Sequence, residues 1–217
     1  KRKHLLGLKD ITAEEIEEIL DTAAEMKKLL NQNVKKTPHL QGKNITTLFY
    51  ENSTRTRVSF ETAAKIMGAN TFNISASSSS VQKGETLIDT GKTLEALLTD
   101  VVIIRHNKSG AAQHLSKNVR NMSVVNGGDG MNEHPTQALL DMLTMKEKFG
   151  SFKGLKVVIA GDVKHSRVAR SNIWGLNKMG AEVTLAAPAT LMPMEVESMG
   201  VKATNDLDSV LEGANVV

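Results

Sequence analysis

The sequence predicts an α/β protein with two doubly wound parallel-sheet domains, the second of them incomplete. Short runs rich in β-branched residues alternate along the chain with amphipathic helical segments, which is typical of parallel sheets covered by helices. The alternation restarts after residue 150, which indicates a second sheet. The 217 residues, of which 40% are apolar, are enough for two modest domains.

The first series begins with a helix that a capping box opens. Thr12 and Glu15 stand three residues apart, ahead of apolar residues at helical spacing from Ile16 to Leu30. The β-branched and aromatic run 45–50 predicts a buried strand, and Gly68 closes the helix that follows it. In order, we expect strand 45–50, helix 53–67, strand 71–74, helix 85–98, strand 101–104, helix 111–117 and strand 123–126.

The second series follows a long helix over 136–149 that ends at Gly150. We expect strand 155–160, helix 166–179, strand 182–186, a short helix over 206–211 and the first residues of a strand at 215–217. The predicted organisation is therefore a domain over 1–134, an interdomain helix over 135–150, and the first part of another domain over 151–217. Doubly wound domains usually continue beyond this point, so we expect a C-terminally incomplete chain.

Composition excludes several classes of function. The absence of cysteine excludes disulfides and metal sites built on thiolates. The 27 basic and 24 acidic residues are interspersed and only five Phe, one Trp and one Tyr are present, which argues against nucleic acid as a partner. No apolar run approaches the ~18 residues of a membrane span or resembles a signal peptide, so we expect a cytoplasmic protein without a membrane partner.

Ser53-Thr54-Arg55-Thr56-Arg57 lies between the strand 45–50 and its helix. A helix N-terminus offers unpaired N–H groups and the positive end of a dipole, and hydroxyl and guanidinium groups placed there add ligands for phosphate. An ordinary N-cap with solvated arginines would explain the same residues. This segment alone leaves both interpretations open.

Two further strand ends carry polar side chains. Arg105 and His106 follow the strand 101–104, while Gly127-Gly128-Asp129-Gly130 and then His134-Pro135-Thr136-Gln137 follow the strand 123–126. Each alone is compatible with a solvated strand end or with a proline that starts a helix. Because parallel strands end at one edge of the sheet, their coincidence favours a ligand site there.

These segments resemble the aspartate and ornithine carbamoyltransferase family. The shared motifs are S-T-R-T-R at 53–57 and H-P-T-Q at 134–137, supported by segments at 79–87, 104–106 and 128–130, and the likeness covers essentially the whole chain. Lys83 in a K-G-E context and Arg167 resemble the aspartate branch. The positive charges of Lys83 and Arg167 also favour the aspartate branch, since they suit an acidic amino acid and would repel the ammonium group of ornithine. A surface-loop lysine and a solvated helix-start arginine are the alternatives.

The resemblance implies transfer of a carbamoyl group from carbamoyl phosphate to L-aspartate, the committed step of pyrimidine biosynthesis, by a homotrimer with shared active sites. It assigns the phosphate to Ser53, Thr54, Arg55 and Thr56, the carbamoyl oxygen to Thr56, Arg105 and His134, and the carbamoyl nitrogen to Gln137. Ser79 and Lys83 would enter from the adjacent subunit, and Lys83 with Arg167 would hold the aspartate carboxylates. Glu51 would pair with arginines across the interdomain cleft. The family has a further aspartate-binding arginine and a Leu-Pro loop beyond the position of residue 217.

Two other functions stay open at this point: a carbamoyltransferase for another amino acid, and a non-catalytic fragment that binds carbamoyl phosphate. A dinucleotide site would need G-x-G-x-x-G after the strand 155–160, where only Gly161 is present. His134 has Glu133 beside it but no second histidine at helical spacing. We therefore expect neither a metal nor a cofactor.

Overall fold

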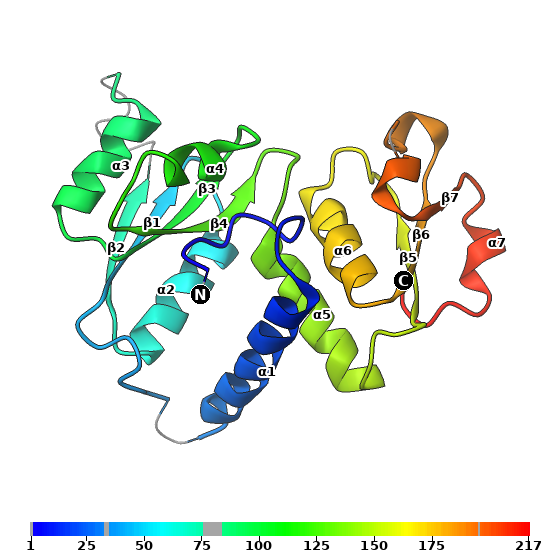
Figure 1. The fold of residues 1–217 in the computed structure, drawn as a ribbon, viewed down its shortest axis with the longest axis horizontal. Coiled ribbons are helices and arrows are strands. Elements are labelled where there is room, and N and C mark those ends of the chain that lie inside the picture. The colour runs from blue at the N-terminus through cyan, green and yellow to red at the C-terminus, as the bar shows by residue number, and fades with distance from the viewer. Residues whose placement is uncertain (1, 33–34, 76–83, 195) are drawn as a thin grey trace. The chain divides into compact units, whose positions relative to one another are not determined.

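The computed structural model describes residues 2–32, 35–75, 84–194 and 196–217. The chain forms two compact units (Figure 1). The first consists of Lys1–Leu6 and Met26–Gly130, and the second of Gly7–Glu25 and Met131–Val217. Helix α1 (Ala13–Leu30) begins in the second unit.

The first unit is a parallel sheet of four strands in the order β2-β1-β3-β4. The strands are β1 (Asn44–Phe49), β2 (Asn70–Ser75), β3 (Val101–His106) and β4 (Ser123–Asp129). Figure 1 shows α2 (Thr54–Ile66) on one face and α3 (Leu87–Ala96) with α4 (Ala111–Ser116) on the other. The predicted α/β class with parallel sheets is confirmed.

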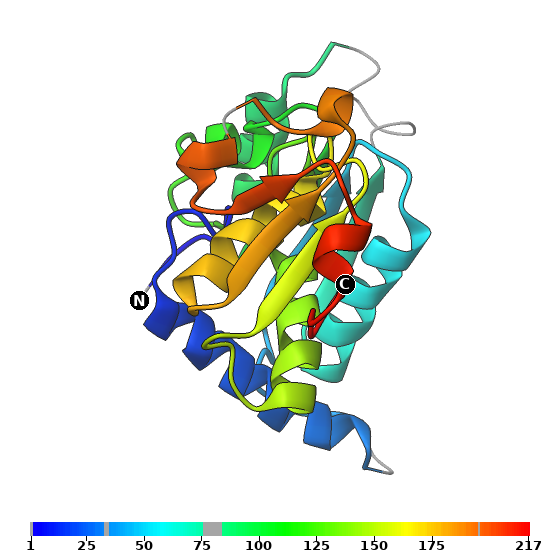
Figure 2. The same ribbon diagram turned by 90° about the vertical axis from the view of Figure 1, so that its right-hand side faces the viewer.

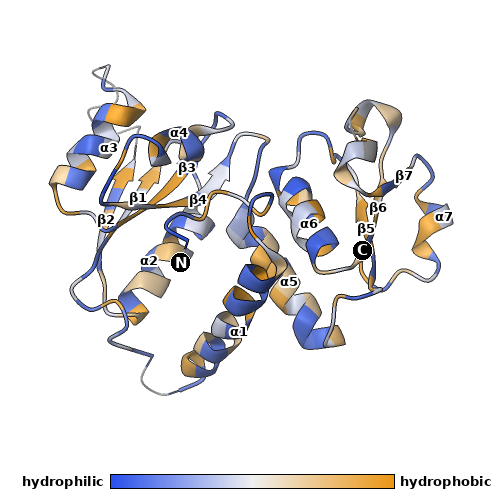
Figure 3. Cartoon of the chain, in the orientation of Figure 1, coloured by the Kyte–Doolittle hydropathy of each residue, from blue (hydrophilic) through white to orange (hydrophobic). Residues whose placement is uncertain are grey.

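Strand β3 is apolar because both of its faces are covered. Val102 and Ile104 are buried in a cluster with Leu94 of α3 and Leu115 of α4, whereas Ile103 packs on the opposite face with the α2 side. Successive side chains of a strand point to opposite faces, so a strand with helices on both sides must be apolar at every position. Figure 3 shows the resulting hydrophobic colour along β1 and β3.

The helix ends follow the sequence signals. The Thr12 N–H group donates to Glu15 Oε2 at 3.0 Å and the Glu15 N–H group donates to Thr12 Oγ1 at 3.2 Å, which completes the predicted capping box ahead of α1. Gly68 follows α2 with a φ of +83°, a conformation that favours glycine.

The second unit contains a parallel sheet in the order β5-β6-β7 (Figure 2). Its elements are α5 (Pro135–Phe149), β5 (Lys156–Ala160), α6 (Arg167–Lys178), β6 (Glu182–Ala186), the 3-10 helices η3 (Ala189–Leu191) and η4 (Val196–Met199), β7 (Lys202–Thr204) and α7 (Asp208–Leu211). Val216 forms a parallel bridge with Val157, and the Val158 N–H group donates to its carbonyl at 2.9 Å. The strand expected at 215–217 therefore begins to pair beside β5.

The largest differences between the observed and the predicted strands lie in three places. Strand β3 continues through Arg105 and His106, because the Tyr50 N–H group donates to the Arg105 carbonyl at 2.8 Å. Strand β4 continues through Asp129. Strand β7 was not expected, since its three residues, Lys-Ala-Thr, carry no apolar alternation. In the part of the chain that the structure describes, no helix is long and apolar enough to cross a membrane.

Candidate active site

The N-terminus of α2 lies at the carboxyl edge of the first sheet. Ser53 is the N-cap residue with an extended backbone (φ −154°), and its side chain makes no capping hydrogen bond to the helix. The first turn holds no acidic residue, and its first backbone hydrogen bond runs from the Arg57 N–H group to the Ser53 carbonyl at 3.1 Å. The preceding N–H groups and the positive end of the helix dipole are thus left for an anion.

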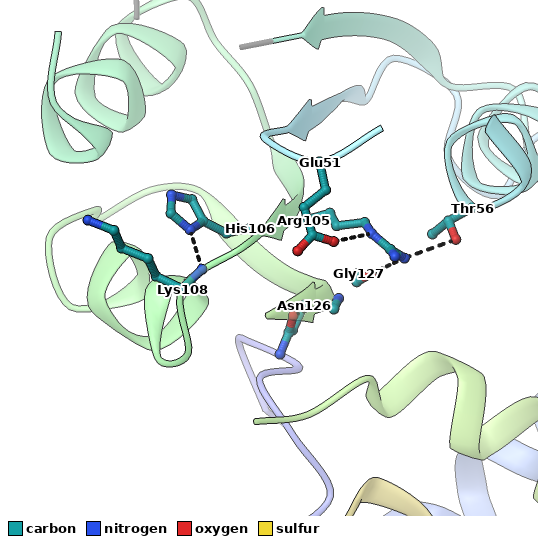
Figure 4. A network of polar contacts seen from close by, with 8 residues as sticks. Glu51, Thr56, Arg105, His106, Lys108, Asn126 and Gly127 are labelled. Carbon is teal, nitrogen blue, oxygen red and sulfur yellow. Dashed lines mark hydrogen bonds and ion pairs between the residues drawn. The ribbon is translucent and has the colours of Figure 1, made fainter. Parts of the chain in front are cut away.

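Arg105 joins the end of β3 to this helix (Figure 4). Its Nη1 group donates to Thr56 Oγ1 at 3.3 Å and to the Gly127 carbonyl at 3.4 Å, and its Nε group donates to Glu51 Oε2 at 3.1 Å. The Arg105 side chain is only 14% exposed. A guanidinium so far removed from water needs a paired charge, which Glu51 supplies.

One partner of Glu51, Arg105, lies in the same unit, and the expected pairing of Glu51 with arginines across a cleft stays a prediction. Glu51 follows β1 and Arg105 ends β3, and these two strands are neighbours in the sheet. The register of the parallel pair therefore places both side chains at one edge. A sequence pattern does not specify which strands are neighbours, so this pairing was missed.

A β-bulge stands opposite Arg105. Ile104 pairs with Asn126 and His106 pairs with Asp129, so two residues of β4, Gly127 and Gly128, face Arg105 alone. Gly128 has a φ of +116°, which requires glycine. Bulges commonly re-aim a side chain beside a functional site, and here the bulge presents the Gly127 carbonyl to Arg105.

Buried side chains of Asn126 and Asp129 hold this bulge. Asn126 Oδ1 accepts from the Gly128 N–H group at 2.8 Å, and Asn126 Nδ2 donates to Asp129 Oδ1 at 2.7 Å and to the Leu6 carbonyl at 2.8 Å. Asp129 Oδ2 accepts from the Gly110 N–H group at 2.6 Å. Sequence reasoning gave neither residue a role, although polar residues in a glycine-rich strand end were the available signal.

His106, next to Arg105, is partly buried against Tyr50. The centroid of its ring lies 4.4 Å from that of the Tyr50 ring. Its Nδ1 atom accepts from the Lys108 N–H group at 2.9 Å, as Figure 4 shows. Burial lowers the pKa of His106, and the charge of Lys108 lowers this pKa further. The neutral ring suits its role as a hydrogen-bond acceptor.

His134 belongs to the second unit, where it precedes α5. Its backbone N–H group donates to Ser171 Oγ at 2.8 Å, and the Ser171 hydroxyl donates to Glu133 Oε2 at 2.9 Å. Glu133 also accepts from the Leu8 N–H group at 2.6 Å. The side chains of Glu133, His134 and Ser171 are all buried. Glu133 and Ser171 thus fix the backbone at His134, a function that the sequence pattern did not reveal.

Gln137 lies on α5 and Arg167 on α6, both in the second unit. Gln137 Nε2 donates to Asp141 Oδ1 at 3.0 Å, and Asn172 Nδ2 of α6 donates to Asp141 Oδ2 at 2.8 Å. Arg167 is the first residue of α6, directly after the N-cap Ser166, whose side chain accepts from the Ala169 N–H group.

The structure brings Thr56 and Arg105 together in the first unit and places His134, Gln137 and Arg167 in the second. Thr54 and Arg55 are exposed in the first turn of α2, next to the half-buried Ser53. Ser79 and Lys83 lie outside the residues that the structure describes. Over the described ranges, no group of three or more His, Cys, Asp or Glu side chains could hold a metal ion.

Comparison with known proteins gives a family match. The model of the aspartate/ornithine carbamoyltransferase carbamoyl-P binding domain matches residues 3–147. The aspartate carbamoyltransferase catalytic subunit of Ruminiclostridium cellulolyticum is 65% identical over 217 residues, which are 100% of this chain and 69% of that protein. The corresponding subunit of Acetivibrio thermocellus is 63% identical, with the same coverage.

Solved structures show the same architecture. The catalytic subunit of M. jannaschii aspartate transcarbamoylase has a TM-score of 0.88 at 37% identity, covering 99% of this chain and 72% of that chain. Aspartate transcarbamoylase from Trypanosoma cruzi in complex with N-(phosphonacetyl)-L-aspartic acid has a TM-score of 0.89 at 32% identity, covering 100% and 71%. Another structure of the Trypanosoma cruzi enzyme is a complex with carbamoyl phosphate and aspartate. It has a TM-score of 0.86 at 32% identity and covers 95% of this chain and 68% of that chain.

Proposed function

Because this chain belongs to the aspartate/ornithine carbamoyltransferase family, we propose that it transfers the carbamoyl group of carbamoyl phosphate to the amino group of L-aspartate. The products are N-carbamoyl-L-aspartate and phosphate, and the reaction is the committed step of de novo pyrimidine biosynthesis. The observation that carries the proposal is the contact of Arg105 with Thr56 at the N-terminus of α2. The aspartate branch follows from 65% identity over the whole chain to an aspartate carbamoyltransferase catalytic subunit.

The first turn of α2 suits the phosphate. Ser53, Thr54 and Thr56 contribute hydroxyl groups, Arg55 contributes an exposed guanidinium, and the helix end contributes N–H groups. Charge-assisted hydrogen bonds of this kind stabilise an anion more strongly than neutral ones. These residues are our proposed phosphate ligands.

Thr56, Arg105 and His134 are the proposed donors to the carbamoyl oxygen. In the reaction the aspartate nitrogen attacks the carbamoyl carbon, negative charge grows on that oxygen, and the carbon–oxygen bond to phosphate breaks. Phosphate leaves with the electron pair and accepts the amine proton, so no separate general base is required. Glu51 holds Arg105 by its Nε edge, which leaves the Nη edge directed at Thr56. Donors fixed in this way favour the transition state.

Gln137 is the proposed ligand of the carbamoyl nitrogen, and Arg167 with Lys83 is proposed to bind the carboxylates of aspartate. Ser79 and Lys83 are proposed to act in the active site of an adjacent subunit within a homotrimer. We also propose that the protein is cytoplasmic, as expected from the sequence. Residue roles and assembly rest on the motif match.

The decisive experiment offers isotopically labelled carbamoyl phosphate with aspartate and ornithine together. We expect N-carbamoyl-L-aspartate as the labelled product, identified by mass spectrometry. Carbamoylated ornithine instead would assign the chain to the other branch. Binding of carbamoyl phosphate in calorimetry without turnover of either amino acid would identify a binding protein.

A further inference from the structure

Two amide side chains of the second unit meet on one carboxylate. Gln137 Nε2 and Asn172 Nδ2 donate to separate oxygens of Asp141, at 3.0 and 2.8 Å. An ionised carboxylate only accepts hydrogen bonds, whereas an amide has one donating and one accepting end. Asp141 can therefore bind only the NH₂ end of each amide, and its charge fixes the orientation of both.

This orientation makes the Gln137 Oε1 atom the part of the amide that can bind a ligand. With Nε2 on Asp141, the end of the amide that remains for a ligand is the acceptor Oε1. The carbamoyl nitrogen carries two N–H donors. We propose that Asp141 is a positioning residue that selects the carbamoyl group, by orienting Gln137 so that Oε1 accepts a hydrogen bond from the carbamoyl nitrogen. The inference rests on the role proposed for Gln137 above.

The contacts around Asp141 make its own position well defined. Gln137 and Asp141 stand four residues apart on α5, and pairs at this spacing share one helix face. A pair on a single helix stabilises little, but Asn172 ties the second Asp141 oxygen to α6. Asn172 is buried and also donates to the Val168 carbonyl at 3.2 Å. Asp141 cannot turn away from Gln137 without breaking a bond to another helix.

Acetyl phosphate is the probe that isolates this role, because it replaces the carbamoyl NH₂ group with a methyl group of similar size. An oriented Oε1 loses its partner when the methyl group binds, so the site disfavours acetyl phosphate. Without Asp141 the Gln137 amide can rotate, and its preference for an N–H donor weakens. The ratio of kcat/KM for carbamoyl phosphate to that for acetyl phosphate, both with aspartate as acceptor, measures the selection.

The test compares Asp141→Ala and Asp141→Asn with the natural protein. We expect Asp141→Ala to lower the carbamoyl-to-acetyl ratio by about tenfold, the value of one hydrogen bond, and Asp141→Asn, whose amide oxygen can still accept from Gln137, to lower it by less. Asp141→Asn preserves volume, so the test remains available if Asp141→Ala does not fold. Where acetyl transfer is too slow to follow, dissociation constants of the two acyl phosphates from calorimetry give the same ratio.

Asn172→Ala is the matched control, since it removes the contact between α5 and α6 but keeps Gln137 on Asp141. We expect it to lower thermal stability and to lower the ratio by less than Asp141→Ala does, since the bond from Gln137 Nε2 to Asp141 Oδ1 remains. Gln137→Ala is expected to lower the ratio as much as Asp141→Ala, and the combined variant no further. A ratio that stays at the natural value in both Asp141 variants, or that falls equally in Asn172→Ala, overturns the inference. A natural protein that does not carbamoylate aspartate overturns the proposed function instead.

Discussion

Arg105 shows how one side chain acquires its role from its neighbours. Glu51 balances its charge, Thr56 places it at a helix end, and the Gly127 carbonyl fixes its plane. The sequence predicted that Arg105 and Thr56 would share one sheet edge, because both follow strands that motifs identify. The sequence could not predict that Glu51 pairs with Arg105, or that Ser171 and Glu133 fix the backbone at His134. These contacts depend on tertiary structure.

At the residue scale, Arg55→Ala should lower turnover by at least about tenfold to a hundredfold, because one charge-assisted hydrogen bond to the phosphate contributes roughly 1.5–3 kcal/mol. Steady-state kinetics with carbamoyl phosphate and aspartate measure the effect. Lys65→Ala, in the last turn of the same helix, is the control and should behave as the natural protein. Unchanged kinetics in Arg55→Ala would remove Arg55 from the site.

His106 should make stability depend on pH. Its pKa is lowered by burial and by Lys108, so the unfolded chain binds more protons as pH falls through the ordinary histidine range. The contribution of His106 is therefore present above the unfolded pKa and is lost as pH decreases below it. Urea unfolding at about pH 7.5 and 5.5 should show a smaller loss of stability in His106→Gln than in the natural protein. An equal loss in both would contradict this assignment.

At the scale of elements, the bulge in β4 is stabilised by specific side-chain hydrogen bonds. Two glycines opposite Arg105 form it, and Asn126 with Asp129 holds it through four hydrogen bonds to Gly128, Leu6, Gly110 and each other. The predicted strand ended at residue 126, because glycines weaken a strand pattern. A pattern based on side chains does not show that backbone pairing continues through Asp129.

Asn126→Asp should lower turnover about tenfold to a hundredfold, because two carboxylates would face each other at 2.7 Å and the displaced bulge would misplace Arg105. The reciprocal variant Asn126→Asp with Asp129→Asn restores the bond between the two side chains but not the bond to the Leu6 carbonyl, so it should recover part of the activity. Asn118→Asp is the control, since Asn118 Nδ2 donates to a carbonyl, that of His114, away from the bulge. Failure of the reciprocal variant to recover, while folded, would separate the bulge from catalysis.

At the scale of the molecule, alternation of strands and helices predicted both sheets. Periodicity is local, however, and gave no signal that Gly7–Glu25 groups with Met131–Val217. The contacts that join the two segments include the bond from the Leu8 N–H group to Glu133 Oε2 and the ion pair of Lys146 with Asp21 at 2.8 Å. A β carbon on Gly7 would lie 2.2 Å from Glu133 Oε1, so a larger residue at this position would displace the Glu133 carboxylate from the Leu8 N–H group.

The proposed sharing of active sites between subunits is testable by mixing two inactive variants. Lys83→Ala chains and Arg55→Ala chains should regain part of the activity when their subunits exchange, because some mixed interfaces would join an intact Lys83 to an intact phosphate site. Turnover after verified exchange is the measurement, with each variant alone as the control. Persistent inactivity would mean that one chain builds each site.

The bond from Leu8 to Glu133 also constrains the order in which the chain acquires its structure. Gly7–Glu25 precedes Met26–Gly130 of the first unit, yet its partners in the second unit, such as Glu133, are synthesised more than a hundred positions later. Closing the loop between Leu8 and Glu133 costs more conformational entropy than forming the shorter-range contacts within residues 26–130. During synthesis the first unit can therefore assemble while the N-terminal half of α1 remains unpartnered. Pulse-labelled hydrogen exchange during refolding would record this as late protection of amides 13–25, together with those of α6.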